Sequence, residues 1–329
     1  MPQEIIIIGA GIIGLSSAYE FAKVGAKVTV LERGAAGMEA SWAGGGILFP
    51  LLPWDYPEEV TSLAEAGAFR YREWSALLKE SSGIDPEYSK CGMTVLPGTR
   101  SMEKASAWCT SHNVRFSVRA SGELHLPDVA QVRNPRLLQA LGKTLENMGV
   151  RIVEHCEVNA FLKNEGNISG LKVSGGSVLE AESYVVCAGA WSGEMLGWKD
   201  IFPVKGQMLL FDAKGLLDTI LLKDDIYLIP RRDGLILAGS TLEHCGFDKS
   251  LTQGAHLHEK ASEMLPELKG LSPVKHWAGL RPGSPANMPT ISRHPDFENL
   301  YVNAGHFRYG VTMAPAAARI LANIVFGKP

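Results

Sequence analysis

Apolar runs and glycine follow one another near the start of the chain in an order that predicts its local structure. Within residues 4–33, four consecutive isoleucines come first, followed by a glycine-rich turn, a helical segment and a second apolar strand. A short apolar run bounded by turn residues is typical of a core strand. The order strand, turn, helix, strand predicts a βαβ unit.

Helical spacing of apolar residues predicts further helices. Residues 134–148 place four leucines on one face, with an Asn-Pro start that suits a cap and Gly149 as the end. We also expect a charged helix at 101–112, a helix at 256–265 and a closing helix that begins near Gly310. Residues 58–79 predict a packing helix, whose apolar positions are Val60, Leu63, Ala64, Phe69, Trp74, Leu77 and Leu78.

After the leucine-rich helix the pattern turns to strands. Residues 150–162 predict a strand that returns to the first sheet. Residues 163–192 predict a short β-meander that ends in an apolar strand at 184–187, and residues 300–304 predict another strand. The small residues after Cys187 would let the chain pass close to a ligand seated on the first glycine turn.

The segment 34–57 fits neither period and is rich in Gly, Ala and Pro. Long irregular segments within compact domains are often functional. Gly44, Gly45 and Gly46 would let the backbone lie against a flat ligand. A flexible surface loop is the alternative, but six large apolar residues between 42 and 52 argue for burial.

Composition narrows the classes of function. With 329 residues and 46% hydrophobic residues, the chain supports about two domains with large cores. A net charge of −3 without a basic stripe argues against a nucleic-acid partner. The start of the chain lacks the basic region of a signal peptide, and no apolar run approaches about 18 residues. We therefore expect no membrane span and a cytoplasmic protein.

Cysteine and histidine show no metal-binding pattern. The five cysteines are single and odd in number, which favours reduced thiols over disulfides. His256 and His258 are two residues apart, unlike the i, i+4 pair of a helical zinc site. We predict no metal site.

Gly9, Gly11 and Gly14 form a G-x-G-x-x-G motif at the first turn. In dinucleotide-binding proteins these glycines make a tight turn, admit the pyrophosphate and let the helix pack on the strand. Glu32 follows at about the distance of 20 residues expected of a carboxylate that binds ribose hydroxyls. An acid there would repel a 2′-phosphate, so FAD or NAD fits better than NADP. The alternative is an ordinary βαβ unit with a glycine-rich turn.

The predicted fold class is α/β, with a Rossmann-like (doubly wound) dinucleotide-binding domain and a second α+β substrate domain. Residues 203–213, 219–234 and 235–241 alternate and predict the antiparallel sheet of the second domain. We assign 1–84, 127–204 and 270–329 to the first domain, which would bind the dinucleotide. Residues 85–126 and 205–269 form the substrate domain in this division.

Several ordered blocks give the chain a more specific resemblance. GAGIIG with Glu32 and Arg33, EASWAGGGI, VVCAGAWS, PVKGQ, DIYLIPR, HWAGLRPGSP and GHFRYGVTMAP run through most of its length. In this order they resemble the glycine oxidase branch, associated with thiamine biosynthesis, of the D-amino-acid-oxidase-like flavoproteins. No cysteine follows Cys245, so the C-terminal cysteine that binds flavin covalently in sarcosine oxidases is missing. The resemblance therefore implies non-covalent FAD.

The resemblance also implies a set of FAD-binding residues. They come from the glycine turn, the end of the second strand, the irregular loop, the two middle strands and the start of the closing helix. The set is Gly9, Gly11, Ile12, Ile13, Gly14, Glu32, Arg33, Glu39, Ala40, Ser41, Gly44, Gly45, Gly46, Val158, Ala188, Gly189, Trp191, His306, Phe307, Arg308, Tyr309, Gly310, Val311 and Thr312.

By the same resemblance, Arg281 binds the substrate carboxylate, with Tyr227 as its hydroxyl partner and Arg308 as a second arginine. A planar guanidinium binds a carboxylate through two parallel hydrogen bonds, which suits an amino acid substrate. The residues alone leave alternatives open. Arg281 could be a surface arginine, Tyr227 a structural tyrosine, and Arg308 a tie for the C-terminal turn.

The implied reaction oxidises the carbon–nitrogen bond of glycine, sarcosine or a small D-amino acid by hydride transfer from Cα to flavin N5. Water then hydrolyses the imine to a 2-oxo acid and ammonia, and molecular oxygen is reduced to hydrogen peroxide. A D-amino-acid dehydrogenase that uses a quinone or another acceptor is the main alternative. An NAD-dependent dehydrogenase and a non-catalytic nucleotide-binding module are weaker rivals. A homo-oligomer is expected by analogy alone.

Overall fold

The computed structural model describes residues 2–327 and contains a six-stranded sheet in the order β19-β20-β13-β1-β2-β9. Strands β20, β13, β1, β2 and β9 run parallel, and β19 pairs antiparallel with β20 at one edge. The strands are β1 (Glu4–Ile8), β2 (Lys27–Leu31), β9 (Arg151–Val153), β13 (Ser183–Val186), β19 (Thr290–Arg293) and β20 (Leu300–Ala304).

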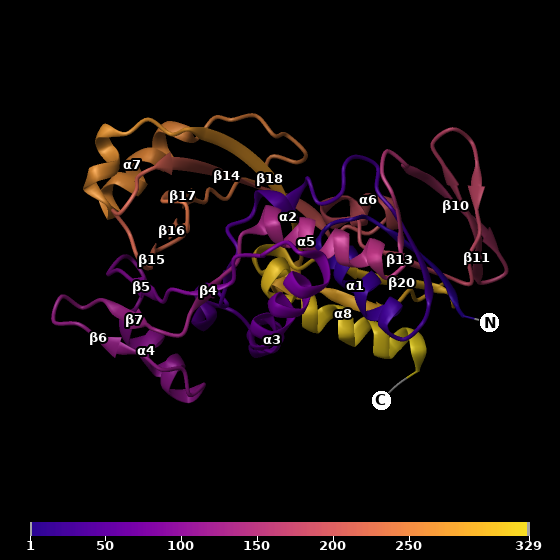
Figure 1. Cartoon of the computed structure of the whole chain (residues 1–329), viewed down its shortest axis with the longest axis horizontal. Helices are drawn as coiled ribbons and strands as arrows, with labels where there is room; N and C mark the ends of the chain where they lie inside the picture. Colours follow the sequence, from indigo (N-terminus) through magenta and orange to yellow (C-terminus); the bar gives the residue numbers. More distant parts are fainter. Residues whose placement is uncertain (1, 328–329) are drawn as a thin grey trace.

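Both faces of this sheet are covered, which explains the unbroken isoleucine run. Ile5 and Ile7 pack with the helices on one face, whereas Ile6 and Ile8 pack with the three-stranded meander on the other. Strands buried on both faces are apolar at every position. The covering elements are α1 (Ile12–Lys23), α3 (Glu58–Ser82), α5 (Asn134–Asn147), α8 (Gly310–Phe326), β10 (Val158–Asn164), β11 (Asn167–Val173) and β12 (Val178–Leu179). In Figure 1, β10 and β11 lie at the right-hand end of the molecule, and α1 and α8 lie nearer its centre.

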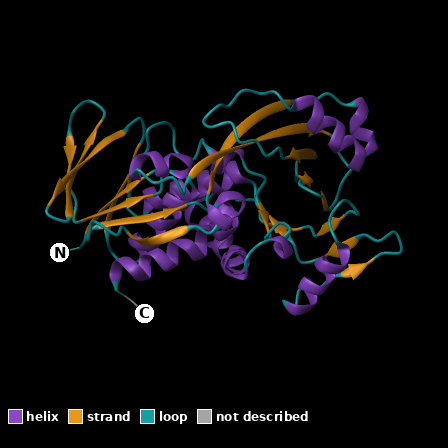
Figure 2. Ribbon diagram, turned by 180° about the vertical axis from the view of Figure 1, so that it is seen from behind, coloured by secondary structure: helices purple, strands orange, loops and turns teal. Residues whose placement is uncertain are grey.

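The second sheet has eight strands in the order β18-β14-β17-β16-β15-β5-β7-β6. Its pairs are antiparallel except β15 with β5. It forms a separate layer in Figure 2, covered at one end by α7 (Gly254–Met264) and near the other by α4 (Met102–Ser111). The strands are β5 (Met93–Val95), β6 (Ser117–Val118), β7 (Leu124–Leu126), β14 (Phe202–Asp212), β15 (Ile220–Lys223), β16 (Ile226–Pro230), β17 (Leu235–Gly239) and β18 (Lys275–Gly283).

These sheets confirm the α/β class, the Rossmann-like domain and the second antiparallel sheet. Strand β18 lies in the second sheet, although the proposed domain boundaries assign its residues to the first domain. Strand β18 follows residue 270, which the division gives to the FAD-binding domain, yet it pairs with β14 along its whole length in the eight-stranded sheet. Adjacent antiparallel strands can come from distant parts of the chain, and the apolar pattern of 275–283 does not reveal its partner. The domain division itself stays a proposal.

Two local predictions are wrong in part. Residues 150–162 form two strands, β9 in the first sheet and β10 in the meander, separated by a turn in which His155 has a positive φ of 55°. Helix α3 is confirmed, but Phe69 is 89% exposed and Leu77 is 53% exposed. The buried face passes instead through Gly67 and Tyr71, because α8 packs closely there.

The irregular segment 34–57 contains α2 (Ala40–Ala43), β3 (Ile47–Leu48) and a 3-10 turn (Pro53–Asp55). Strand β3 pairs with β8 (Ala130–Gln131), which also pairs with β4 (Ser89–Lys90). Its apolar residues are buried, with Ile47, Leu48, Leu51 and Leu52 all below 9% exposure. The expectation of a buried segment is confirmed, and the flexible surface loop is excluded.

The closing helix reaches membrane-spanning length by composition, although charged residues such as Arg319 interrupt its apolar positions, and the expectation of no membrane span stays a prediction. The helical segment Phe307–Phe326 is long and apolar enough by length and composition, and 56% of its apolar window is buried in the protein. It packs against α1 and α3, as the core helix of a globular domain does.

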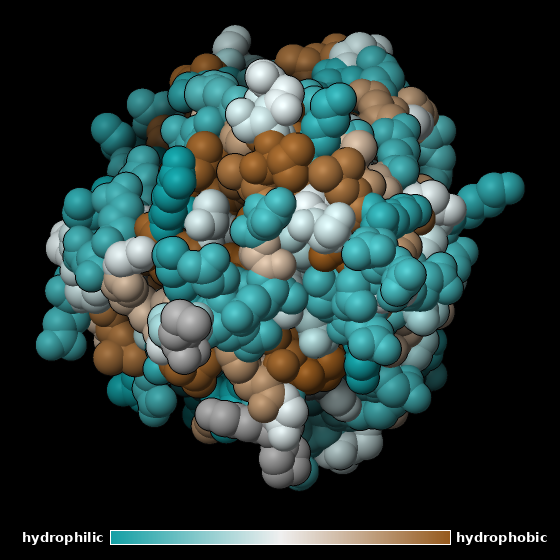
Figure 3. Space-filling model, turned by 90° about the vertical axis from the view of Figure 1, so that its right-hand side faces the viewer, coloured by the Kyte–Doolittle hydropathy of each residue, from teal (hydrophilic) through white to brown (hydrophobic). Residues whose placement is uncertain are grey.

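On the face that carries the meander, apolar side chains gather in small groups among hydrophilic ones (Figure 3).

Candidate active site

Two cavities run from the first glycine turn in opposite directions. The inner cavity extends toward the eight-stranded sheet and the start of α8, and the outer cavity extends along the ends of β1 and β2 toward the meander. They share Gly11, Ala40, Ser41, Cys187 and Gly189. The two cavities therefore meet at the start of α1, and together they form one elongated site.

The three motif glycines have different tasks. Gly9 has φ 105°, and a Cβ on it would lie 2.4 Å from the carbonyl oxygen of Cys187. Gly11 lines both cavities. Gly14 lines neither, and its Cβ would lie 1.9 Å from the Gly9 carbonyl oxygen. Gly14 thus serves the packing of α1 on β1, Gly9 lets the turn approach the main chain at Cys187, and Gly11 leaves room at the cavity.

Glu32 ends β2 beside this turn and lines the outer cavity. One carboxylate oxygen accepts the Ala10 amide hydrogen at 2.9 Å, and the other accepts that of Gly34 at 2.9 Å. The side chain thereby joins the first turn to the chain after β2. Each oxygen has a further lone pair, so the carboxylate can still accept from ribose hydroxyls.

Trp191 carries charged neighbours at the rim of the outer cavity. The Arg33 guanidinium lies 3.6 Å from its ring centroid, and the Phe247 ring stacks on it with centroids 5.3 Å apart. Glu39 pairs with both Arg33 and Lys249. These contacts bring the segment around 247–249 across the rim, although sequence patterns alone did not single it out.

The glycines at 44–46 form one wall of the inner cavity. Gly46 has φ 76°, and its Cβ would lie 2.2 Å from the Val132 carbonyl oxygen. Arg231 donates to the carbonyl oxygens of Gly45 at 2.7 Å and Val132 at 3.1 Å. Burial lowers the pKa of Arg231 to about 10. A half-buried arginine that sequence patterns did not identify thus holds this backbone in place.

The amino end of α8 forms the opposite wall, with Gly310, Val311 and Thr312 lining the cavity. Thr312 Oγ1 donates to the Ile47 carbonyl oxygen at 2.9 Å, which joins the helix start to β3. The helix begins at Gly310, as predicted. Its partial positive charge is therefore directed at whatever occupies the cavity.

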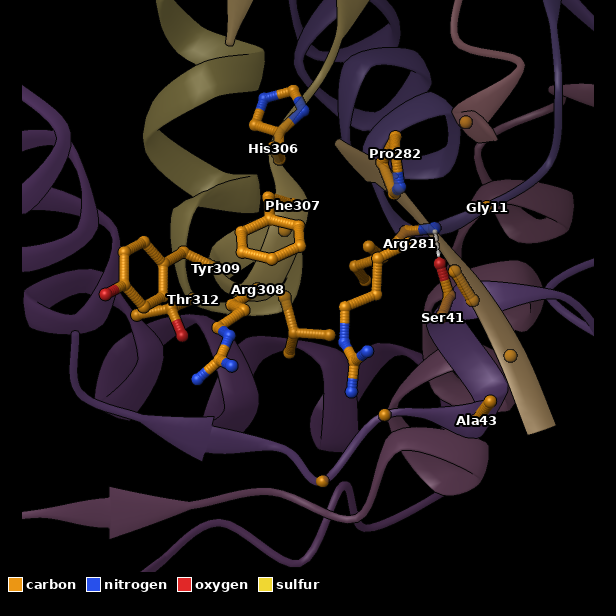
Figure 4. Close-up of a pocket in the computed structure, with 18 of the residues that line it drawn as sticks. Gly11, Ser41, Ala43, Arg281, Pro282, His306, Phe307, Arg308, Tyr309 and Thr312 are labelled. Carbon is orange, nitrogen blue, oxygen red and sulfur yellow. Dashed lines mark hydrogen bonds between the residues drawn. The ribbon is translucent and has the colours of Figure 1, made fainter. Parts of the chain in front are cut away.

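His306 is buried beside this helix start, and neither ring nitrogen has a hydrogen-bond partner in the described part of the chain. Burial lowers its pKa to about 3, so the ring is neutral near pH 7. Figure 4 shows His306 above Phe307 at the edge of the cavity. Two unpaired buried nitrogens are the kind of group that a bound ligand satisfies.

Arg281 extends from β18 into the inner cavity, and Gly206 on the neighbouring strand makes room for it. A Cβ on Gly206 would lie 2.1 Å from the guanidinium nitrogens. Arg281 donates to Ser240 Oγ at 2.6 Å and to the Thr241 carbonyl oxygen at 3.2 Å, both neutral acceptors. Burial lowers the pKa of Arg281, an effect that Tyr227 partly offsets and Arg308 strengthens.

Arg308 lies beside Arg281, and in Figure 4 the two guanidinium groups extend in the same direction below Phe307. Its side chain is only 9% exposed, and Nη1 lies 2.9 Å from an Asp225 carboxylate oxygen. Burial lowers the pKa of Arg308, but Tyr56 and Asp225 outweigh it and the net shift is upward. One arginine therefore has a carboxylate partner and the other has none among the described residues.

Tyr227 is 7% exposed on β16, and its hydroxyl lies 3.5 Å from the Met208 sulfur. The ring passes close to Gly45 and Gly239, where a Cβ would approach its atoms to 3.1 Å and 2.9 Å. The tyrosine thus lies between the glycine wall and Arg281. Its position combines a packing role with a hydroxyl that lines the cavity.

Every residue of the expected site except Gly14 lines one of the two cavities. Sequence patterns missed the groups that complete the inner cavity from other strands, namely Gly206, Met208, Ser240 and Asn303, as well as Asp225, which pairs with Arg308. The open cradle at Gly11 and Gly189, the amino ends of α1 and α8, and the unpaired His306 nitrogens fit a dinucleotide with a flat ring.

Comparisons with known proteins agree with this geometry. Residues 4–324 match the DAO family, described as FAD dependent oxidoreductase. The chain is 40% identical to a glycine oxidase from Pseudomonas aeruginosa over 100% of the chain and 96% of that protein. It is 33% identical to a bifunctional ThiO/ThiG protein of Synechocystis, covering 98% of the chain and 51% of that protein.

Among solved structures, the glycine oxidase from Bacillus cereus superposes with a TM-score of 0.91 at 26% identity, over 99% of this chain and 96% of that one. A family match over nearly the whole chain, together with the relative at 40% identity, settles the class of enzyme and its non-covalent cofactor. The chain belongs to the DAO family of FAD-dependent oxidoreductases, in its glycine oxidase branch, and acts on CH–NH groups.

Proposed function

We propose that the protein oxidises glycine and other small amino acids, including sarcosine and D-amino acids, to the 2-oxo acid and hydrogen peroxide. The nitrogen leaves as ammonia, or as methylamine when the substrate is sarcosine. The observation that carries this proposal is Arg281, a cavity-lining guanidinium whose protein partners are both neutral oxygens. A cation left without a counter-charge in a partly buried cavity is well suited to an anionic ligand. An amino acid carboxylate meets this need through two parallel hydrogen bonds.

Binding at Arg281 would place the rest of the substrate in the inner cavity. The glycine wall at 44–46 and the Tyr227 ring narrow the space around the guanidinium. A two-point contact with the carboxylate removes rotation about one end of the substrate, which contributes to catalysis by positioning. The Tyr227 hydroxyl supplies a further hydrogen-bond donor to the bound carboxylate.

The inner cavity contains no Asp or Glu side chain among its described lining residues. His306 is neutral and Tyr309 is buried, which raises its pKa well above the usual value. A substrate amine that binds in its neutral form needs no side-chain base, because its lone pair assists departure of the hydride from Cα. The lining is consistent with this mechanism.

FAD, when bound, supplies the two-electron chemistry by accepting the hydride and passing the electrons to oxygen. The residues of this chain contribute orientation and electrostatics. The positive amino end of α8 at Gly310–Phe326 would stabilise negative charge that develops nearby during the reaction.

The test is the visible spectrum of the purified FAD-loaded protein under anaerobic conditions, before and after glycine is added, with air admitted at the end. Bleaching of the flavin and rapid recovery in air is the expected result. Slow recovery of the flavin absorbance in air would mean that the electron acceptor is a molecule other than oxygen, as in a dehydrogenase. A flavin that glycine, sarcosine and D-alanine all fail to bleach would overturn the proposal.

A further inference from the structure

The two arginines of the inner cavity differ in how their charge is balanced. Arg281 meets only Ser240 Oγ and a main-chain oxygen, whereas Arg308 forms an ion pair with Asp225 at 2.9 Å. Both guanidinium groups line the same cavity and point the same way (Figure 4). The positive charge of Arg281 is therefore available to an anionic ligand, whereas that of Arg308 is already paired with a carboxylate.

Asp225 lies where the inner cavity meets the surface. It occupies the turn between β15 and β16, and its side chain is 45% exposed. It lines a third cavity, open to solvent, that shares Ser240 with the inner one. The carboxylate thus sits between the exterior and the buried guanidinium of Arg308.

Other charges hold Asp225 in this position. Both of its oxygens accept hydrogen bonds from Arg100 Nη2 at 3.3 Å, and Arg100 also pairs with Asp55. The network joins the turn at 225 to the start of α4 and to the 3-10 turn at Pro53–Asp55. The ion pair is therefore anchored from two sides, and the carboxylate does not depend on Arg308 alone for its placement.

The charges of the pocket decide which anions it can hold. Arg281 offers one positive charge without a carboxylate partner, while Asp225 neutralises that of Arg308. A ligand with one carboxylate balances the free charge. A second carboxylate near Arg308 would have to displace Asp225 or approach it, and like charges in a partly buried site repel. Specificity of this kind rests on a repulsive element as well as an attractive one.

We propose that Asp225 makes the site selective for substrates with a single carboxylate, by occupying Arg308 and repelling a second carboxylate. This inference rests on the proposed amino acid oxidase function and deepens it. Substrates of the expected class are neutral small amino acids with one carboxylate and one amine. Dicarboxylic amino acids, such as D-aspartate, are excluded by Asp225 and not by cavity size alone.

Calorimetric titration of the FAD-loaded protein with acetate, which has one carboxylate, and with malonate, which has two, tests how many carboxylates the pocket accepts. Neither anion is an amino acid, so the measurement does not depend on turnover. Asp225→Asn retains the shape of the side chain but frees Arg308, so malonate affinity relative to acetate should rise about tenfold or more, equivalent to about 1.4 kcal/mol. Asp224→Asn is the matched control, because it removes the same charge from the same turn but hydrogen-bonds to Thr99 and does not pair with Arg308. Its malonate-to-acetate ratio should stay at the wild-type value.

The double variant Asp225→Asn/Arg308→Met shows whether the gain passes through Arg308. It should lose the gained malonate affinity, whereas a general effect of removing negative charge would persist. An equal malonate-to-acetate ratio in wild type and Asp225→Asn would overturn the proposal. Asp225→Ser serves the same comparison if the asparagine variant does not fold.

Steady-state rates give a second readout. The ratio of kcat/KM for D-aspartate to that for D-alanine should rise by a similar factor in Asp225→Asn. A protein that oxidises none of glycine, sarcosine and D-alanine would overturn the proposed function, yet the anion titrations would still decide whether Asp225 restricts the pocket to one carboxylate. An unchanged ratio with intact turnover would overturn the role of Asp225 alone.

Discussion

The two halves of the elongated site differ in the parts of the chain that line them. The outer cavity is centred on the main-chain turn at Gly9 and Gly11 and on Glu32, and the meander and the segment after β13 complete its lining. The inner cavity collects side chains from β14, β16, β18 and the start of α8, including Tyr227 and Arg281. The first is a local backbone motif, and the second exists only when two sheets pack together.

Because of this difference, substitutions in the two cavities should have different effects on folding and on ligand binding. Main-chain geometry at the glycine turn depends on the absence of a Cβ, so small side chains there cause steric conflict. The inner cavity depends on charge and hydrogen bonding, so its substitutions should change ligand affinity more than folding. The predictions below separate these two dependences.

Gly9→Ala should have the largest effect, because it combines a positive φ with a Cβ only 2.4 Å from a main-chain oxygen. We expect a loss of about 3 kcal/mol or more in the free energy of unfolding, together with poor FAD retention. Gly25→Ala is the control, since Gly25 has φ 86° but open space around its Cβ. It should cost about 1 kcal/mol. Urea unfolding and the flavin absorbance after gel filtration provide the measurements, and equal losses in both variants would refute the steric argument.

Arg281→Ala should leave folding and FAD retention nearly intact and raise KM for glycine. Loss of a charge-assisted contact worth about 1.5–3 kcal/mol corresponds to a rise of about 10- to 150-fold. Arg281→Lys keeps the charge but not the two-point geometry, so its KM for glycine should lie between that of the wild type and that of Arg281→Ala. Steady-state kinetics measures this, and an unchanged KM in the alanine variant would remove Arg281 from the substrate site.

His306 should make stability depend on pH. Burial lowers its pKa from 6.5 to about 3, so the folded state binds this proton less readily than the unfolded state. The contribution of the neutral ring to stability is fully present above about pH 6.5 and is lost as pH falls toward 3, by about 1.4 kcal/mol per pH unit. His306→Leu should show a shallower fall in urea midpoint between pH 6.5 and 4.5. Parallel curves for the two proteins would contradict the assignment.

Tyr227→Phe should have the smallest of these effects. It removes one hydroxyl while keeping the ring that packs against the glycine wall, and a neutral hydrogen bond contributes about 0.5–1.5 kcal/mol. We expect KM for glycine to rise about 2- to 12-fold with little change in stability. Tyr184→Phe is the control, because its hydroxyl accepts from the Ala181 amide outside both cavities. An equal KM in Tyr227→Phe and wild type would leave Tyr227 with a packing role only.

Much of the fold follows from local pattern. The isoleucine run, the glycine motif and the leucine face of α5 predicted the correct elements, because each pattern records burial within one short segment. Failures occurred where burial depends on a distant partner. The helical spacing of α3 placed Phe69 on the packing face, but the face is set by the close approach of Gly67 to Thr312.

The candidate site shows the same division. Motifs and the family resemblance placed the expected residues around the cavities, including Arg281 and Arg308. No spacing connects Asp225 with Arg308 or Arg231 with Gly45, since 83 and 186 positions separate the partners. Such contacts depend on strand pairing and sheet packing, which no local pattern records.

The sequence by itself determined the parallel βαβ unit, the glycine turn and the kind of cofactor that this turn accepts. These depend on main-chain sterics and on apolar period, which act over a few residues. Only the tertiary structure decided which arginine keeps its charge available for a ligand. That choice depends on whether a carboxylate from another strand lies within ion-pair distance, and Asp225 does so for Arg308 but not for Arg281.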